Sequence, residues 1–297
     1  MTTVDVVADT DMPQLFQAAD QASLEAQKAY VGGTRNRLLL LGAAALLGIF
    51  TWRVGVARID VFALVGMGIF VAALLIDSNL WRERPDKAWY DGRAVAESTK
   101  TLAWKFAVCG LPFPADLSGE DAAQALLERM HSVREQFRDL QLTPLDVPLI
   151  SEWMVLQRDS TLEDRRQSYL TARISDQKGW YARKASYNRS RAKRWRSTLV
   201  TLELAGVASS LWAAFSESVT ALAPAIAALV VGVVAWTETK QHDANARAYA
   251  AAVADLASAE AKLQLAVTEE SWAREVDDAE EAISREHVIW LATRSRL

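Results

Sequence analysis

The stretch TLVTLELAGVASSLWAAF, residues 198–215, is followed by the short segment SES and then by a second apolar stretch, VTALAPAIAALVVGVVAW, residues 219–236. An unpaired backbone amide or carbonyl costs several kcal/mol in lipid, so an apolar run that enters a bilayer must be helical. Both runs fall within the ~17–25 residues that a membrane-spanning helix needs. The sequence therefore predicts a two-helix membrane hairpin.

A second pair of apolar runs lies nearer the N-terminus, from Leu38 to Trp52 and from Ile59 to Ile76. The first of these reaches spanning length only by extending to Ala57, with the long side chain of Arg53 reaching back to the interface. The predicted spans are therefore 38–57, 59–76, 198–215 and 219–236. No segment alternates convincingly with period two, so no sheet is expected. The expected fold is all-α: a polytopic membrane protein with two transmembrane hairpins flanked by long cytoplasmic helices.

Composition adds limits to this interpretation. The formal net charge of −4 indicates no general preference for nucleic acid. The single cysteine, Cys109, excludes an intrachain disulfide and fits a reducing compartment. The first apolar run begins near residue 38, after a polar and acidic lead, whereas a cleaved signal peptide would start earlier behind a basic leader. The first span is therefore expected to be retained.

Lysine and arginine are concentrated on the terminal sides of both hairpins, and the SES connection carries none. Because cytoplasmic flanks carry an excess of these residues, both termini and the central region are expected in the cytoplasm. The strongest basic cluster precedes the third predicted span. It consists of Arg183, Lys184, Arg189, Arg191, Lys193, Arg194 and Arg196.

The chain reads as two modules in tandem, 1–145 and 146–297. SLEAQKAY (23–30) resembles ISDQKGWY (174–181), and each copy precedes a hairpin. Outside the spans, the segment from Trp81 to Phe106 is expected to be one helix that leaves the membrane. Ser118 and Thr161 are expected to cap further helices, the second of which should run on into the third span. An apolar stripe at spacings of four and three indicates a coiled-coil-like cytoplasmic helix. It consists of Leu126, Met130, Val133, Phe137 and Leu140. Such stripes must pack together or against other subunits.

No catalytic constellation stands out. His131, His242 and His287 are far apart and lack cysteine or carboxylate neighbours at the spacing of metal ligands. There is no glycine-rich phosphate loop, and nothing resembles a nucleophile beside its base. The sequence therefore indicates a protein that is not an enzyme and that needs no metal or cofactor.

Glu203 is the most informative single residue, because it lies about one and a half turns into the third predicted span. Small and acidic residues share its helical face and could line a polar, cation-favouring passage where helices of several subunits meet. This predicted pore-lining set is Glu203, Gly206, Ser210, Ala214 and Glu217. Two alternatives remain. Glu203 could pair with Arg194 or Arg196 at the interface, or the face could be a close-packed helix contact.

The basic cluster also allows two interpretations. Each basic residue near an anionic membrane contributes about 1 kcal/mol, so a topological and lipid-facing role is expected. The alternative is nucleotide binding, in which Trp180 and Tyr181 would stack on a base while Arg183 and Lys184 pair with phosphate.

Three motifs resemble one known family. QKGWYARKA (177–185), before a two-span hairpin, resembles the entry motif of SLATT domains, which are bacterial two-span modules found beside nucleotide-signalling genes. AEEAISREH (279–287) with Trp290 is similar to the terminal signature of one subfamily. WYDGRA (89–94), AESTK (96–100) and Trp104 resemble the helix after the hairpin in another. The resemblance covers most of the chain as two tandem modules.

This resemblance implies a membrane effector of a bacterial conflict or antiphage system, from a family whose members are proposed to form membrane-disrupting pores. The apolar stripes of the cytoplasmic helices favour an oligomer, and hairpin connections too short to bind an outside ligand favour a trigger from the cytoplasmic side. The expected location is the bacterial inner membrane, with both termini cytoplasmic as the lysine and arginine distribution indicates. Expected partners are the lipid bilayer, further copies of the chain, and a nucleotide second messenger or sensor protein; no nucleic acid is expected. The family supplies no pore residues. The alternative is a non-conducting membrane scaffold whose cytoplasmic helices recruit a partner.

Overall fold

The computed structural model describes residues 7–216 and 222–294, with side chains up to residue 284. Its contacts divide the chain into two compact units, each assembled from segments distant in sequence. Unit 1 comprises Met1–Ala26, Asp86–Ser186 and Ala246–Leu297, and unit 2 comprises Gln27–Pro85 and Tyr187–Asn245. Both predicted modules therefore contribute to both units.

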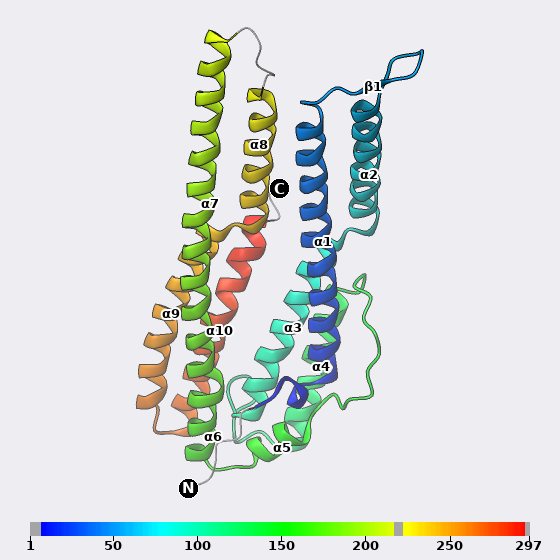
Figure 1. Cartoon of the computed structure of the whole chain (residues 1–297). Helices are drawn as coiled ribbons and strands as arrows, with labels where there is room; N and C mark the ends of the chain where they lie inside the picture. Colours follow the sequence, from blue (N-terminus) through cyan, green and yellow to red (C-terminus); the bar gives the residue numbers. More distant parts are fainter. Residues whose placement is uncertain (1–6, 217–221, 295–297) are drawn as a thin grey trace. The chain divides into compact units, whose positions relative to one another are not determined.

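Helices make up most of the described chain (Figure 1). In order, the elements are the 3₁₀ turn η1 (Asp9–Asp11), α1 (Gln14–Leu47), β1 (Arg53–Val54), β2 (Ile59–Asp60), α2 (Val61–Glu83), α3 (Pro85–Ala107), α4 (Gly119–Gln136), α5 (Glu152–Arg158), α6 (Leu162–Ser168), the π-helical segment η2 (Tyr169–Ser175), α7 (Asp176–Phe215), α8 (Ala223–Lys240), α9 (His242–Leu265) and α10 (Glu269–Arg294).

Within the described residues, three helical stretches are long and apolar enough to cross a membrane. They are Val61–Ala107, Leu162–Phe215 and Ala223–Leu265, whose most apolar 18-residue windows have mean hydropathies of 2.3, 1.4 and 1.2. Almost none of each window is buried in the fold, at 6%, 0% and 6%. An apolar helix left uncovered by its own chain is stable only where lipid or another protein covers it. The chain is thus an all-α protein of the membrane-spanning type.

The first predicted span differs from the prediction. Its helix, α1, ends at Leu47, and β1 and β2 form a two-stranded antiparallel ladder that pairs Arg53 with Asp60. The expected helix as far as Ala57 and the expected absence of a sheet are therefore both wrong. The turn between the strands holds Gly55 and Arg58 in the left-handed region, at φ of 71° and 49°, and a right-handed helix cannot continue through such residues.

The junction after the first hairpin also differs from the prediction, which expected one helix from Trp81 to Phe106. Arg84 is left-handed, with φ of 46°, and Pro85 starts α3. Proline disfavours the helical conformation in the residue before it, and it is well suited to the first position of a new helix. By contrast, α6, η2 and α7 follow one another without a gap from Leu162 to Phe215, which confirms the predicted long helix. Both predicted caps are confirmed, because Ser118 and Thr161 accept hydrogen bonds from the backbone of Asp121 and Asp164.

The core of unit 1 combines aromatic side chains from α3, η2 and α10. The ring of Tyr169 lies edge-on to Trp104 at 5.7 Å and to Trp272 at 5.8 Å between ring centroids. The indole N–H of Trp272 donates to the carbonyl of Val108 at 2.7 Å, so this buried polar group is satisfied. Helices from both modules therefore form one shared core.

The apolar stripe of α4 and the loop after it belongs to that core. Leu126, Met130 and Leu140 are buried in it, and Val133 and Phe137 pack against it. The stripe is therefore covered by the chain's own side chains, and in this arrangement it does not offer a seam to another subunit.

Unit 2 contains the four apolar runs and packs them through small residues and one ion pair. A Cβ built on Gly33 would lie 3.0 Å from Leu80, and one on Gly42 would lie 3.3 Å from Leu229. At the end of the hairpin, Arg37 Nε lies 3.0 Å from Asp77 Oδ1. Glycine lets neighbouring helices approach closely, which is a usual device of membrane helix packing.

Candidate functional site

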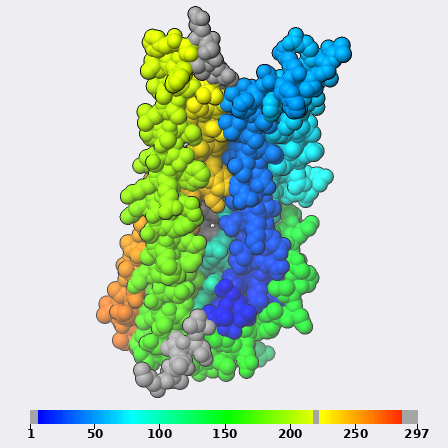
Figure 2. Space-filling view, viewed as in Figure 1, coloured from blue at the N-terminus to red at the C-terminus, as the bar shows by residue number. Residues whose placement is uncertain are grey.

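The apolar end of α7 carries the predicted pore-lining face, and α7 lies at the surface in yellow-green on the face shown in Figure 2. Glu203, Ser210 and Ala214 are exposed along it. Gly206 turns toward α8 instead, because a Cβ there would meet Ile226 at 3.5 Å. Glu217 lies outside the described residues. Of the predicted face, Glu203, Ser210 and Ala214 are therefore exposed, and Gly206 lies in a contact with α8.

Glu203 forms no ion pair with the described residues. In the part of the chain that the structure describes, no ion pair or hydrogen bond joins it to Arg194 or Arg196, so the interfacial pair considered from the sequence is not formed. Its neighbours Leu204 and Val207 are 64% and 66% exposed. A carboxylate therefore lies beside an uncovered apolar face, near the start of the apolar end of a helix long enough to span a membrane.

The basic cluster forms the half of α7 before this apolar end. Its side chains are exposed except that of Arg191, which is partly buried. Two cations lie over aromatic rings of their own helix: Lys184 is 5.2 Å from the ring centre of Trp180, and Arg191 is 5.2 Å from that of Tyr187. Such contacts hold the aliphatic stems along the helix while the charges remain accessible. The arrangement suits contact with an anionic surface.

The aromatic pair considered for nucleotide stacking is engaged inside unit 1. Tyr181 is 3% exposed and stacks on Tyr249, with ring centres 5.7 Å apart and planes inclined by 29°. Trp180 lies edge-on to both tyrosines. A base could not reach the face of Tyr181 without displacing this cluster. The geometry therefore disfavours the nucleotide site that the sequence left open.

Among the described residues, no group of three or more His, Cys, Asp and Glu is placed so that it could hold a metal ion. His242 instead shares a short contact of 2.7 Å between Nδ1 and Asn188 Oδ1, and both residues are buried. Cys109 is buried as well, and burial raises the pKa of its thiol despite the nearby arginines. A thiol held neutral in this way is a poor nucleophile.

Sequence reasoning missed a fully buried and heavily bonded polar group of unit 1, the carboxylate of Glu280. Arg173 donates to both carboxylate oxygens of Glu280, at 2.9 and 2.7 Å, and the two side chains are 2% and 0% exposed. The hydroxyls of Tyr169 and Thr101 also donate hydrogen bonds to that carboxylate, at 3.1 and 2.8 Å. The partners are separated by more than a hundred residues, so only the membership of Glu280 in the motif AEEAISREH could have drawn attention to it.

These observations define a class: an all-α membrane protein with two pairs of apolar runs and a folded helical body. The family model of the SMODS and SLOG-associating 2TM effector domain 3 matches residues 13–166, and that of domain 1 matches residues 169–290. The chain belongs to this family as a tandem of two effector domains. Comparison with curated proteins and with solved structures found no match.

The two matches meet between residues 166 and 169, whereas the sequence prediction divided the chain between 145 and 146. The segment between these positions contains α5 and most of α6, which pack in unit 1 with helices of both halves. The division at 145 stays a prediction. Each matched domain is described as having two transmembrane segments, so the tandem corresponds to the two pairs of apolar runs.

Proposed function

We propose that this chain is an oligomeric membrane effector of a bacterial conflict or antiphage system, and that it opens a passage through the inner membrane when a signal reaches its cytoplasmic side. The family description supports the effector role. The observation that carries the passage is Glu203, a carboxylate exposed on a span and without an ion-pair partner among the described residues.

A charged group at the centre of a membrane helix costs about 2.5–3.5 kcal/mol on insertion scales, and less toward the interface. Unit 2 offers Glu203 no cover, because the residue is exposed. If α7 helices of several copies surround an axis with Glu203 and Ser210 turned inward, the carboxylates meet water instead of lipid. Rings of acidic side chains favour cations. The proposed passage is therefore cation-selective and exists only in the assembled protein.

The fold of unit 1 supports the proposed topology. Ser23 Oγ donates to the carbonyl of Trp89 at 3.1 Å, and Thr101 Oγ1 donates to Glu280 at 2.8 Å. Segments before the first hairpin, between the hairpins and after the second hairpin thus pack in one body, which must lie on one side of a membrane. Each hairpin must then cross the membrane an even number of times. Together with the basic cluster, this favours four spans and two cytoplasmic termini.

In this topology the first predicted span crosses the membrane, although its apolar segment is short. The run from Leu38 to the end of α1 at Leu47 covers about 15 Å at 1.5 Å per residue, half of a ~30 Å hydrocarbon core. The exposed side chains of Phe50 and Trp52, which contact Phe62, continue the apolar path beyond the helix. We propose that the bilayer is thinned at this point, as it is around other spans shorter than the hydrocarbon core.

The same topology places any trigger inside the cell. The connection from β1 to β2 is a tight turn, and α7 and α8 are joined by a short segment, so neither offers a folded domain to an outside ligand. Unit 1 presents several helices to the cytoplasm, where a nucleotide second messenger or a sensor protein can act on it. A free-energy difference of a few kcal/mol between the closed and open states is enough for a signal to control the passage.

The test is ion flux from liposomes that contain the purified full-length protein. We expect a cation flux that Glu203→Gln reduces or makes less selective for cations over anions. Glu238→Gln is the matched control, because it makes the same charge change at an exposed position of α8 beyond the apolar run. It should leave both flux and selectivity unchanged.

Protein that inserts and assembles but shows no flux under any trigger would favour the non-conducting scaffold instead. Equal effects of the two substitutions would mean that surface charge, and not a lined passage, governs the flux. Tags at the two ends provide a separate test of topology. In intact cells both should be protected from reagents outside. Labelling of one end alone would contradict an even number of spans, and labelling of both ends would contradict the cytoplasmic termini.

A further inference from the structure

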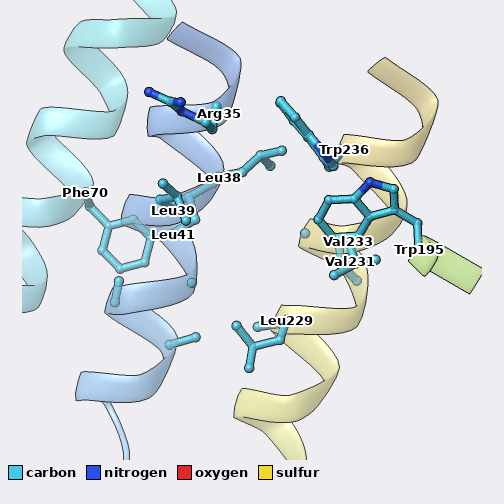
Figure 3. A pocket seen from close by; sticks show the side chains of 15 residues that line it. Arg35, Leu38, Leu39, Leu41, Phe70, Trp195, Leu229, Val231, Val233 and Trp236 are labelled. Atoms are coloured by element: carbon cyan, nitrogen blue, oxygen red, sulfur yellow. The ribbon is translucent and has the colours of Figure 1, made fainter. Parts of the chain in front are cut away.

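Unit 2 contains an apolar groove between its two hairpins, with a volume of about 770 Å³ (Figure 3). One wall is α1, with Leu38, Leu41 and Gly42, and the other is α8, with Leu229 and Gly232. Figure 3 shows Leu38 of α1 and Leu229 of α8 reaching from two separate helices into the space between them. The volume lies in the range of ligand pockets, and in a membrane a space of this kind does not stay empty.

The length of the groove corresponds to one leaflet of a bilayer. Along α1 its lining runs from Arg35 to Ala45, which is about 15 Å at 1.5 Å per residue. Along α8 it runs from Ala228 to Trp236, about 12 Å by the same measure. The hydrocarbon core is ~30 Å thick, so the groove accommodates an extended chain from one leaflet only.

The width excludes a helix as the occupant. A Cβ on Gly42 would be only 3.3 Å from Leu229, so the two hairpins touch at this level. An α-helix with its side chains is ~10–12 Å across and could not pass between them. At Gly232, by contrast, a Cβ would meet none of the described atoms within 4 Å, so this wall borders open space. The opening is a slot for a thin, flexible apolar chain.

One end of the slot has the residues of a membrane interface. Arg35 lies there with an exposed guanidinium, which makes no ion pair within the described part of the chain. Trp195 and Trp236 face each other edge-on at 6.5 Å on the opposite side, and Lys240 lies 5.5 Å from the ring centre of Trp236. Tryptophan and basic side chains gather where acyl chains meet headgroups.

We propose that this groove is a binding site for one anionic phospholipid of the cytoplasmic leaflet. An acyl chain lies between α1 and α8, and the phosphate pairs with Arg35 beside the two tryptophans. The site does not depend on conduction, because it lies within unit 2 of one chain and away from the exposed Glu203 face of α7. A scaffold with the same fold would bind the same lipid.

The experiment uses full-length protein in liposomes with trace amounts of phosphatidylglycerol or phosphatidylcholine that carry a photoreactive diazirine in one acyl chain. Mass spectrometry of peptides then locates the adducts. We expect them on residues 38–45 of α1 and 228–236 of α8, with about fivefold preference for phosphatidylglycerol, the ratio that one basic residue supplies at ~1 kcal/mol.

Two pairs of variants separate the parts of the proposal. Gly232→Leu fills the slot without a clash and should reduce groove adducts several-fold, whereas Gly68→Leu makes the same change on exposed α2 and should not. Arg35→Gln should remove the preference for phosphatidylglycerol, whereas Arg53→Gln in β1 should leave it intact.

Adducts at equal yield on groove residues and on exposed Leu74 of α2 would identify ordinary surrounding lipid and overturn the proposal. Groove labelling that Gly232→Leu leaves unchanged would also overturn it. An unchanged lipid preference in Arg35→Gln would refute the headgroup assignment. Cross-links from groove residues to another copy of the chain would show that protein occupies the slot.

Discussion

The ion pair between Arg173 and Glu280 makes the sharpest prediction about stability. It joins η2 to α10 through two charged hydrogen bonds in a site almost closed to water. Burial alone would lower the pKa of Arg173, but the charge and hydrogen bonds of Glu280 raise it, so the guanidinium stays protonated. Burial, reinforced by the same carboxylate, raises the pKa of Tyr169 and keeps its hydroxyl a donor.

Removing one partner leaves the other as an uncompensated buried charge, which costs about 3–5 kcal/mol. For a folded body of roughly 150–250 residues, 1 kcal/mol changes the Tm by about 2–4 °C, so the expected fall is about 6–20 °C. Glu280→Ala should reach the upper part of this range, because it also leaves the Tyr169 and Thr101 hydroxyls without their acceptor. The double variant Arg173→Met with Glu280→Leu should lose much less, since it removes both charges and keeps the volume.

The assay is thermal unfolding of the full-length protein in detergent, followed by near-ultraviolet circular dichroism and tryptophan fluorescence. Trp104 and Trp272 flank Tyr169, so both signals report on this region. A double-mutant cycle gives the coupling between the two residues. A fall below about 4 °C for Glu280→Ala, or a double variant as unstable as the sum of the single ones, would refute the reasoning.

Three further predictions concern unit 1. Gly110→Ala should destabilise by about 1–3 kcal/mol, because its Cβ would lie 2.4 Å from Val276 Cγ1, and Val276→Ala should restore most of the Tm. Leu126→Ala should cost about 2–5 kcal/mol and lower the Tm without changing oligomer size on gel filtration, since its side chain is fully buried in the chain's own core. Burial raises the pKa of Asp20 more than Arg93 lowers it, so the ionised form opposes folding above the unfolded pKa of about 3.9. Asp20→Asn should therefore raise the Tm slightly at pH 7, by less than about 2 °C, and the difference should vanish near pH 3; a difference that grows on acidification would contradict the sign.

The sequence predicted elements whose signals are local. The caps at Ser118 and Thr161, the long helix into the third span and the all-α class all follow from residue types at fixed short spacings. The break before Pro85 was within reach of the same reasoning, because the residue before proline is restricted. It was missed because the prediction treated residues 81–106 as one helix and considered only the later prolines, Pro112 and Pro114, as its end.

The remaining features depend on residues far apart in the chain. No local sequence pattern predicts that Arg173 pairs with Glu280. Likewise, none predicts that the ring of Tyr181 stacks on Tyr249, which leaves no free ring face for a nucleotide base. The β1–β2 turn was missed for a different reason. Its strands are only two residues long, too short for an alternating pattern, and Arg53 was interpreted as a snorkelling side chain.

The burial of the α4 stripe changes where assembly must take place. A heptad-like pattern indicates a surface that needs a partner, and here the partner is the core of the same chain. Large apolar side chains that remain uncovered in the described residues concentrate instead on α2 and α7, among them Phe70, Leu75 and Leu211. If the proposed effector assembles, its subunits are therefore expected to meet through their spans. Assembly would then bring the exposed carboxylate of Glu203 into contact with other copies, so the step that joins subunits would also decide whether this charge faces lipid or water.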